Sequence, residues 1–449
     1  MSTAVNVAKF GGTSVADFEA ISHCAHVVKR NSETRVVVVS AAAGVTNLLV
    51  KLAFSPLSQA QITETCDEIR HIEYNILQHI GHKTDIQTKL DDLLSEVEAL
   101  GRHEEILHRV DLKDALLSMG ERMSSLLCTE VFKQHGIAAL NVDVRNVMIT
   151  DETHGEAVPQ VAHIKERAEQ LLQPELHTHV IVTQGFVGAD IQGNTTTLGR
   201  GGSDFTAALL AEALNAKSCE IWTDVIGVYT TDPRLTAAAR PLPELSFEEA
   251  AEMATFGAKV LHPATMEPAL RCDIPVFVGS SREPEKGGTW IVRDCEHEPA
   301  YRAITRRREQ VMVTVKTPKM LYAQGYLEKV FGIIAKHKLS VDLVTTSEIA
   351  ISFTLDNPPN SVAERLNQAT IAELETMSEV TVEKGFDLVT VVGNNMQTAK
   401  GVSSRIFAAI ADYNLRMICF GANPHNMSFL VNADDSAEVV AVLHKALFE

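Results

Sequence analysis

The chain has 449 residues, of which 45% are hydrophobic and 22% charged. At about 100 to 200 residues per domain, this length predicts two to four domains with a large core and excludes a disordered or collagen-like chain. The net charge of −18 argues against a general nucleic-acid or anionic-membrane binder, because affinity for phosphates comes mainly from lysine and arginine. Any bound phosphate must be held locally.

The sequence also predicts the compartment and the state of the thiols. No apolar run reaches the roughly 20 residues that span a bilayer, and the amino terminus has no signal-peptide pattern, so we expect a cytoplasmic protein. The closest of the seven cysteines, Cys272 and Cys295, are 23 residues apart. We therefore expect reduced thiols and no metal held by protein side chains.

Up to about residue 300, short β-branched runs alternate with helical stretches, which predicts a layered α/β domain. Unbroken apolar runs, typical of strands buried on both faces of a sheet, occur at 36–39, 180–182, 221–222 and 275–278. Helices are expected at 207–216 and 248–260. Residues 57–135 are polar and helix-periodic, with helices expected at 64–80, 85–100 and 115–133, and we interpret them as a helical excursion over one end of the sheet.

Beyond residue 300 the chain contains an internal repeat with an offset of 76 residues. Seven identities share this register: Gly325, Phe331, Ile334, Ala335, Leu339, Ser352 and Phe353 recur as Gly401, Phe407, Ile410, Ala411, Leu415, Ser428 and Phe429. The first copy predicts strand, helix, strand, strand and helix at 311–315, 327–337, 341–345, 349–355 and 362–376, and the second spans 388–447. Tandem units of this split-βαβ kind, without catalytic-looking residues, indicate a binding module after a boundary at 282–308.

Three glycine-bearing turns indicate an anion site in the first part of the chain. Residues 9–14 (KFGGTS) follow a strand, and paired glycines let backbone N–H groups approach an anion beside the Lys9 charge. Residues 195–204 lead into a helix expected to begin near Phe205, with Ser203 or Asp204 as its cap. A plain capped turn would not require Arg200 or three consecutive threonines. With the turn at 40–47, these segments predict a phosphate and carboxylate site at one edge of the sheet.

Two further segments point to phosphoryl transfer. Residues 222–234 resemble a strand, a turn and an aromatic-polar loop suited to a nucleotide, and residues 256–263 place Lys259 in an apolar setting. Transfer of a γ-phosphoryl group needs positive charge on the phosphates and little covalent participation by the protein. Lys9 and Lys259 meet that requirement from separate loops.

Five segments occur in this order along the chain: KFGGTSV, SAAAGVTN, TTTLGRGGSD, WTDVIGVYTTDPR and FGAKVLHP. Their order and spacing resemble those of aspartate kinases of the amino-acid kinase family, and the repeat resembles the tandem ACT regulatory domains of those enzymes. The resemblance covers nearly the whole chain and is greatest to the monofunctional, lysine-sensitive type III. No GxGxxG segment or extra domain follows, so no fused homoserine dehydrogenase is expected.

The resemblance implies an α/β fold class: a layered catalytic domain at 1–295, then two α+β ACT-like (βαββαβ) domains at 300–385 and 386–449 that share a strand from about 301–308. It implies phosphorylation of the β-carboxylate of L-aspartate by ATP with Mg²⁺, and feedback inhibition by L-lysine. It also implies a homodimer, or a dimer of dimers, formed through the ACT-like domains.

The resemblance also assigns residues of the catalytic site. It implies that Lys9, Lys259 and Asp204 are catalytic, with Asp204 orienting the lysines. Nucleotide contacts fall on Lys9, Phe10, Gly11, Gly12, Thr223, Asp224, Tyr229, Arg234, Lys259 and Val260. Aspartate contacts fall on Thr46, Glu121, Arg200, Gly201, Gly202 and Ser203. The chemistry agrees, because the fork of Arg200 suits an α-carboxylate and Glu121 suits an α-ammonium group.

For the effector, the resemblance implies contacts by Met320, Ala323, Tyr326, Leu327, Ser340, Val341, Asp342, Ser347 and Glu348. We expect Asp342 and Glu348 to pair with the two ammonium groups of lysine. The second copy has Ile418 and Pro424 at the corresponding positions, so it is expected to form a dimer contact instead. Related enzymes often carry a serine where this chain has Ala323, which predicts a weaker affinity.

Two alternatives stay open at this point. The same fold could phosphorylate another small acid, as glutamate or acetylglutamate kinases do, although the repeat and the FGAKVLHP segment argue against it. The chain could also be a catalytically silent amino-acid sensor. The presence of both lysines, Asp204 and Arg200 argues against that interpretation.

Overall fold

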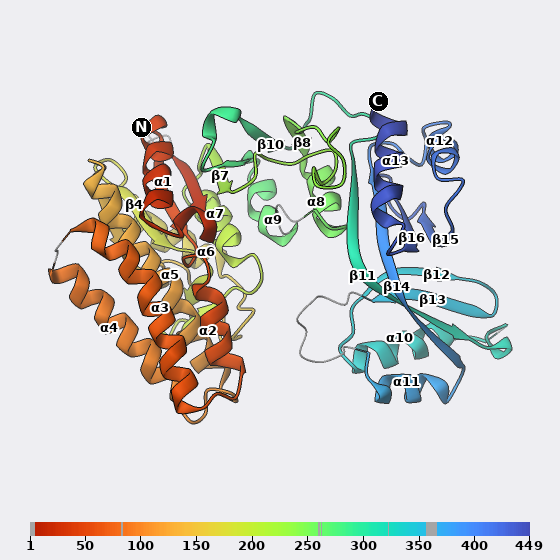
Figure 1. The fold of residues 1–449 in the computed structure, drawn as a ribbon, viewed down its shortest axis with the longest axis horizontal. Coiled ribbons are helices and arrows are strands. Elements are labelled where there is room, and N and C mark those ends of the chain that lie inside the picture. Colours follow the sequence, from red (N-terminus) through yellow and green to blue (C-terminus); the bar gives the residue numbers. More distant parts are fainter. Residues whose placement is uncertain (1–4, 82–83, 259–260, 262, 322, 356–365) are drawn as a thin grey trace. The chain divides into compact units, whose positions relative to one another are not determined.

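The computed structural model describes residues 5–81, 84–258, 261, 263–321, 323–355 and 366–449. The described chain packs into two compact units, which are treated separately below (Figure 1). The first unit comprises residues up to 228 together with 241–250 and the segment ending at Cys295. The second comprises 229–240, 251–259 and 296–449. Among the described residues, no helix has the length and apolar character needed to cross a membrane.

The first unit is built on one eight-stranded sheet, ordered β3-β4-β2-β1-β7-β9-β10-β8. The strands are β1 (Asn6–Phe10), β2 (Thr34–Val39), β3 (Ala139–Val142), β4 (Val180–Gln184), β7 (Ser218–Thr223), β8 (Glu244–Ser246), β9 (Val276–Ser280) and β10 (Gly288–Val292). All neighbours pair in parallel except β9 and β10. The apolar runs predicted as buried strands form β2, β4, β7 and β9, which confirms the layered α/β class.

The helices of this part of the chain pack on the sheet or on one another. They are α1 (Phe18–Arg30), α2 (Val45–Phe54), α3 (Gln59–Ile80), α4 (Thr84–Gly101), α5 (Val110–Gln134), α6 (Val161–Leu171), α7 (Gly202–Ala213), α8 (Phe247–Thr255) and α9 (Pro263–Arg271). Of these, α5 contacts β2, β3 and β4, and α7 contacts β1, β2 and β7. Short 3-10 turns lie at η1 (Gly12–Val15), η2 (Val144–Asn146) and η3 (Pro284–Lys286), and β5 (Val187–Ala189) pairs with β6 (Thr195–Thr197) as a small hairpin. The helix expected at 248–260 ends earlier, at Thr255.

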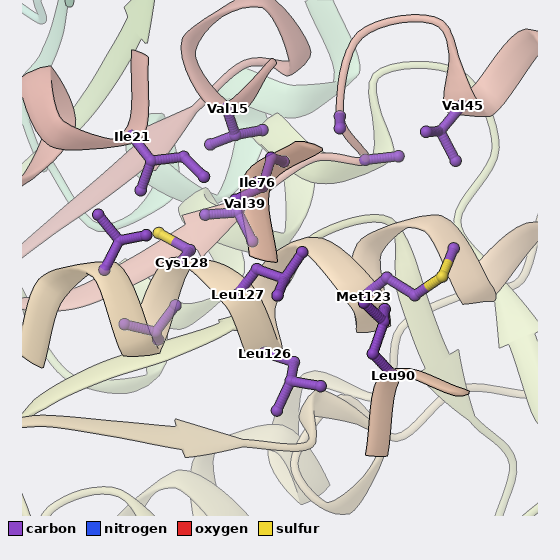
Figure 2. Close-up of a cluster of buried hydrophobic side chains, with 14 of the residues drawn as sticks. Val15, Ile21, Val39, Val45, Ile76, Leu90, Met123, Leu126, Leu127 and Cys128 are labelled. Carbon is purple, nitrogen blue, oxygen red and sulfur yellow. The ribbon is translucent and has the colours of Figure 1, made fainter. Parts of the chain in front are cut away.

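The expectation of a helical excursion is wrong for α5. This helix packs against β2, β3 and β4 as well as against α1 to α4, so it is a central layer of the unit. Two of its buried polar residues have their hydroxyls bonded to carbonyls one turn back: Ser118 Oγ donates to Ala115 O (2.7 Å) and Thr129 Oγ1 to Ser125 O (2.7 Å). Figure 2 shows Leu127 and Cys128 of this helix within the core cluster.

The second unit is built on a six-stranded antiparallel sheet, ordered β12-β13-β11-β14-β16-β15. Its strands are β11 (Ala303–Lys316), β12 (Val341–Thr346), β13 (Ala350–Leu355), β14 (Glu379–Val392), β15 (Leu415–Phe420) and β16 (Asn426–Asn432). Its helices are α10 (Tyr326–Lys336), α11 (Gln368–Glu375), α12 (Val402–Ala409) and α13 (Ser436–Phe448), and η4 (Pro318–Met320) precedes α10. Of the helix expected at 362–376, residues 362–365 lie outside the described residues.

Two long strands run through both halves of this sheet (Figure 1). The last part of β11 pairs with β13 and with the start of β14, while the first part pairs with the end of β14 in the register Ala303 to Val392. Each half has its own core, one around Phe353 under α10 and α11, the other around Phe429 under α12 and α13. The repeat in the sequence thus becomes two similar halves of one sheet.

Candidate active site

The candidate site lies at one edge of the first sheet. In a parallel sheet the carboxyl ends of the strands meet at the same edge, and this is where α/β proteins bind ligands. The strands β1, β2, β4 and β7 end there, followed by the turns at 11–15, 40–44, 185–186 and 224–227. The motifs singled out in the sequence therefore meet at this edge through the parallel register.

Lys9 and Asp204 form the electrostatic centre of this edge. Lys9 Nζ lies 2.7 Å from Asp204 Oδ1, and the side chains are only 11% and 16% exposed. Lys9 belongs to β1 and Asp204 to the first turn of α7, so residues 195 positions apart in the sequence are joined in one ion pair. The ion pair holds the buried ammonium group in a fixed position. A positive group must be fixed in advance to stabilise a negative charge that develops during a reaction.

The glycines of the site are required by close contacts. A Cβ on Gly12 would lie 2.8 Å from the carbonyl oxygen of Ala41, and one on Gly185 would lie 2.5 Å from the Cβ of Ser203. A Cβ on Gly202 would meet the ring of Phe186 at 2.7 Å. Any side chain at these positions would push apart the turns after β1, β2 and β4. The glycines therefore bring the backbones of these turns within contact distance of one another.

The helix that follows the TTTLGRGGSD segment begins three residues earlier than expected. α7 starts at Gly202, not near Phe205, and it is preceded by Gly201 in the left-handed conformation (φ 75°). Neither Ser203 nor Asp204 caps it, because no side chain bonds to its first N–H groups. The first turn of a helix presents free N–H groups and a positive dipole end, so α7 offers an anion site at the predicted place.

The three threonines of this segment have a structural role. Thr197 Oγ1 donates to Asp114 Oδ1 (2.6 Å), Thr196 and Thr150 share a hydrogen bond (2.7 Å), and the hydroxyl of Thr195 accepts from Arg145 (3.0 Å). These bonds fix β6 to α5 and to the segment around Thr150. The inference that a threonine run points to a ligand is therefore not needed.

Glu121 is the buried acid of the site. It lies on α5, is 6% exposed, and follows Gly120, where a Cβ would lie 2.6 Å from the Cβ of Ala41. Burial raises the pKa of the Glu121 carboxyl to about 8, against a lowering by hydrogen bonding from the Ala41 backbone and by the charge of Lys9. The structure thus brings Glu121 into the neighbourhood of Lys9 and of the turn after β2.

Other predicted substrate and nucleotide residues lie at the surface of the same edge. Thr46 is exposed in the first turn of α2, and Arg200 is exposed just before α7. Thr223 ends β7 and its hydroxyl donates to Asp224 Oδ1 (3.1 Å). Phe10 is fully buried, and its carbonyl oxygen accepts from the Ser40 N–H group (3.2 Å).

Two of the remaining nucleotide residues do not fall in the first unit. Tyr229 and Arg234 belong to the second unit, where the Arg234 guanidinium, 85% exposed, pairs with Asp232 at 2.6 Å. Lys259 and Val260 lie outside the described residues. Their predicted roles stay predictions.

The predicted effector residues occupy the first half of the second sheet. Asp342 lies on β12 and its Oδ1 is 3.3 Å from Arg307 Nη1, while Ser347 and Glu348 form the turn between β12 and β13. Tyr326 begins α10 and its hydroxyl bonds to that of Ser378. Of the other predicted contacts, Met320 and Ala323 lie before α10, Leu327 lies in its first turn, and Ser340 and Val341 lie at the start of β12.

Two buried acids of the first unit, Asp114 and Glu73, were not singled out in the sequence. Asp114 on α5 accepts from Thr197, lies 2.9 Å from His154 Nδ1 and accepts from the Gly155 N–H group (3.0 Å). Glu73 on α3 is 0% exposed. The signal for Glu73 was present, because it occupies a position of the buried stripe Ile62, Cys66, Ile69, Ile76 and Ile80, where helical spacing calls for an apolar residue.

Comparison with known proteins agrees with this geometry. The model of the amino acid kinase family matches residues 4–280, and an ACT domain model matches residues 389–447. The chain is 46% identical to lysine-sensitive aspartokinase 3 of Escherichia coli over 99% of both chains, and 33% identical to an aspartokinase of Chlamydia pneumoniae over 98% of this chain and 96% of that one. The structure of the E. coli aspartokinase III in complex with aspartate and ADP matches with a TM-score of 0.89 over 99% of this chain and 100% of that one.

The chain belongs to the amino acid kinase family, because the family model matches residues 4–280. The mostly parallel sheet with its glycine-lined edge agrees with this assignment. Within that family, the relatives just described, which match along the whole chain, are aspartokinases, and the first of them is the lysine-sensitive type.

Proposed function

We propose that this protein transfers the γ-phosphoryl group of ATP to the β-carboxylate of L-aspartate and that L-lysine inhibits it. The observation that carries the proposal is the buried Lys9–Asp204 pair at the glycine-lined edge of the sheet. Two structures of the E. coli aspartokinase III, one with aspartate and ADP and one with lysine and aspartate, are 46% identical to this chain, which supports both the substrates and the inhibitor.

On the phosphate side, the chain supplies positive charge and backbone N–H groups. Lys9 would neutralise charge that grows on the transferred group, and Asp204 would hold the Lys9 ammonium in place. Lys259 and the nucleotide residues Thr223, Asp224, Tyr229 and Arg234 are proposed to complete this side. No side chain is needed as a nucleophile, so no phosphoenzyme is expected.

Mg²⁺ fits the residues present only as a partner of the nucleotide. The described residues contain no group of three or more histidine, cysteine, aspartate or glutamate side chains placed to hold a metal ion. Mg²⁺ commonly keeps several waters and binds through substrate phosphates with one or two carboxylates. When bound with ATP, it would supply additional positive charge on the phosphates.

On the acceptor side, we propose that Arg200 and Glu121 bind opposite ends of the aspartate backbone. The exposed guanidinium of Arg200 can form a two-pronged contact with the α-carboxylate. Glu121, buried beside the turn after β2, would pair with the α-ammonium group, while Thr46, Ser203 and the start of α7 would complete the pocket. These contacts position the β-carboxylate for in-line attack.

For the inhibitor, we propose a site in the first half of the second sheet. Asp342 lies on β12 and Glu348 in the turn that follows it, and each would pair with one ammonium group of lysine. We also propose that the ACT-like halves of two copies form a homodimer.

One assay tests the proposal. The protein is incubated with ATP, Mg²⁺ and either aspartate or glutamate, and the acyl phosphate is trapped as a hydroxamate. We expect product with aspartate and much less with glutamate, because one extra methylene costs roughly 1 to 3 kcal/mol in a tight pocket. Lys9→Ala should lower kcat by about 10² to 10³. Lack of product with aspartate, or near-normal turnover of Lys9→Ala, would contradict the proposal.

A further inference from the structure

Helix α3 carries a carboxyl group that the rest of the described structure does not neutralise. Glu73 is 0% exposed, and among the described residues neither of its side-chain oxygens has a hydrogen-bond partner. Buried acids are ordinarily paired with a cation or bonded to several donors, because burial of a lone charge costs several kcal/mol. An unpaired buried carboxyl group lowers the stability of the fold, so the presence of Glu73 needs an explanation other than stability.

Two contacts place the helix residues next to Glu73 and Glu121 against the turn after β2. The residue before it, Ile72, has its Cδ1 3.6 Å from the point where a Cβ on Gly44 would lie. The residue before Glu121 is Gly120, whose Cβ would lie 3.4 Å from Cγ1 of Val45. Glu73 and Glu121 are therefore the next residues along two packed helices that flank the same turn.

The core around this turn confirms that α3 and α5 lie together here. Ile76, one turn after Glu73 on the same side of α3, belongs to the cluster that contains Val39, Val45, Met123 and Leu127 (Figure 2). The turn itself, residues 41–45, follows β2 at the edge of the sheet where the substrate is proposed to bind. The apolar side chains of this cluster keep water away from Glu73, which is 0% exposed.

The charges of the two acids depend on each other. Burial, and to a smaller extent the negative charge of Glu121, raise the pKa of the Glu73 carboxyl to about 8. Burial also raises the pKa of Glu121 to about 8, with the Lys9 ammonium as the opposing charge. Near neutral pH the pair therefore carries at most one negative charge, and the second charge appears only as the pH rises.

We propose that Glu73 is a positioning residue for the amino group of the acceptor. It is a second acid behind Glu121, and it ionises when the α-ammonium group of aspartate binds or when the pH rises. The added negative charge makes the pocket bind aspartate more tightly. This inference rests on the proposed function. It predicts that KM for aspartate falls more steeply with rising pH than a single acid allows, because two protons leave the pocket instead of one.

The test compares wild type with Glu73→Gln between pH 6.5 and 9. Glutamine keeps the shape of the side chain and cannot ionise. In the wild type, log KM for aspartate should fall with a slope approaching two through the upper part of this range, and in Glu73→Gln with a slope no greater than one. At pH 9 the variant should have a KM for aspartate about tenfold higher, the equivalent of one pKa unit, while KM for ATP stays the same.

The control is Glu68→Gln, an exposed acid on the same helix, which should reproduce the wild-type profile. Equal slopes in wild type and Glu73→Gln would overturn the proposal, and so would an equal change in the KM values of both substrates. Neither result touches the proposed function, which is tested separately by the phosphorylation of aspartate and by Lys9→Ala.

A second measurement follows the proton directly. The unfolded chain ionises Glu73 near pH 4.5 and the folded chain near pH 8, so folding takes up a proton between these values and stability falls as the pH rises through this window. The thermal midpoint should therefore drop less from pH 5 to pH 8 in Glu73→Gln than in the wild type. An equal drop would show that Glu73 does not hold its proton in the folded state, and would overturn the proposal.

Discussion

The two halves of the second sheet have nearly the same scaffold and different chemistry. Phe353 and Phe429 are both fully buried, Ile334 and Ile410 are both 2% exposed, and Gly325 and Gly401 both precede a helix in the left-handed conformation. These pairs are related by the offset of 76 residues. The residues that the halves share are therefore those that the fold requires.

The differences fall on the edge strands. Asp342 of β12 lies in a half-buried ion pair with Arg307, whereas the corresponding residue of β15, Ile418, is 44% exposed. Glu348 of the first half corresponds to Pro424 of the second. After duplication of a unit, the scaffold positions are constrained by packing while the edges are free to change. This comparison teaches that a ligand specific to one half should be sought at its edge strand.

The largest test of the shared scaffold is the removal of one buried ring from each half. We expect Phe353→Ala and Phe429→Ala each to cost about 3 to 5 kcal/mol, because both leave a cavity in a closed core. Denaturant unfolding of the full chain measures the cost. If one substitution were nearly neutral, the cores would not be equivalent and the comparison would fail.

A test of the difference between the halves uses their edge strands. Asp342→Ala should abolish inhibition by lysine, a coupling typically of about 1 to 3 kcal/mol, because it removes the acid proposed to pair with an ammonium group. Ile418→Ala is the matched control and should leave inhibition unchanged. The measurement is the lysine concentration that halves the rate at fixed aspartate and ATP. Inhibition lost in the control variant, or kept in Asp342→Ala, would place the effector elsewhere.

The smallest expected effect concerns Gly325 and Gly401, the glycines that precede α10 and α12. Gly325→Ala and Gly401→Ala should each lower stability by about 1 kcal/mol, because φ values of 73° and 82° disfavour a side chain although space is available for a Cβ. Equal shifts of the denaturation midpoint would sharpen the equivalence of the halves. A shift in only one would show that the two helix starts are held differently.

The fold class was accessible from the sequence because its signals are local. Runs such as 36–39 and 180–182 have no polar residue, and only a strand buried on both faces needs that composition. The repeat was also visible, since its seven identities include the buried Ile334, Phe353 and their counterparts.

What the sequence analysis missed depends on contacts between distant residues. The polarity of Ser118 and Thr129 suggested a solvated helix, yet their hydroxyls are satisfied within α5 and the helix lies at the centre of the unit. The partner of Thr197 is Asp114, 83 residues away, and no local pattern predicts that pairing. Glu73 looked like one more polar residue of α3, although its place in the apolar stripe marked it as buried.

The long strands β11 and β14 have a consequence for how the second unit forms. Their pairing joins Lys316 to Glu379 and Ala303 to Val392, so residues that are 63 and 89 positions apart in the sequence must meet before the ladder can form. Contacts this distant in sequence slow folding, because the entropy of loop closure is lost before the contacts are gained. Each half also lacks a neighbouring strand until the other half is present. We therefore expect the two halves to fold in a single slow, cooperative step, and a chain ending between them to leave an unpaired strand that is prone to aggregation.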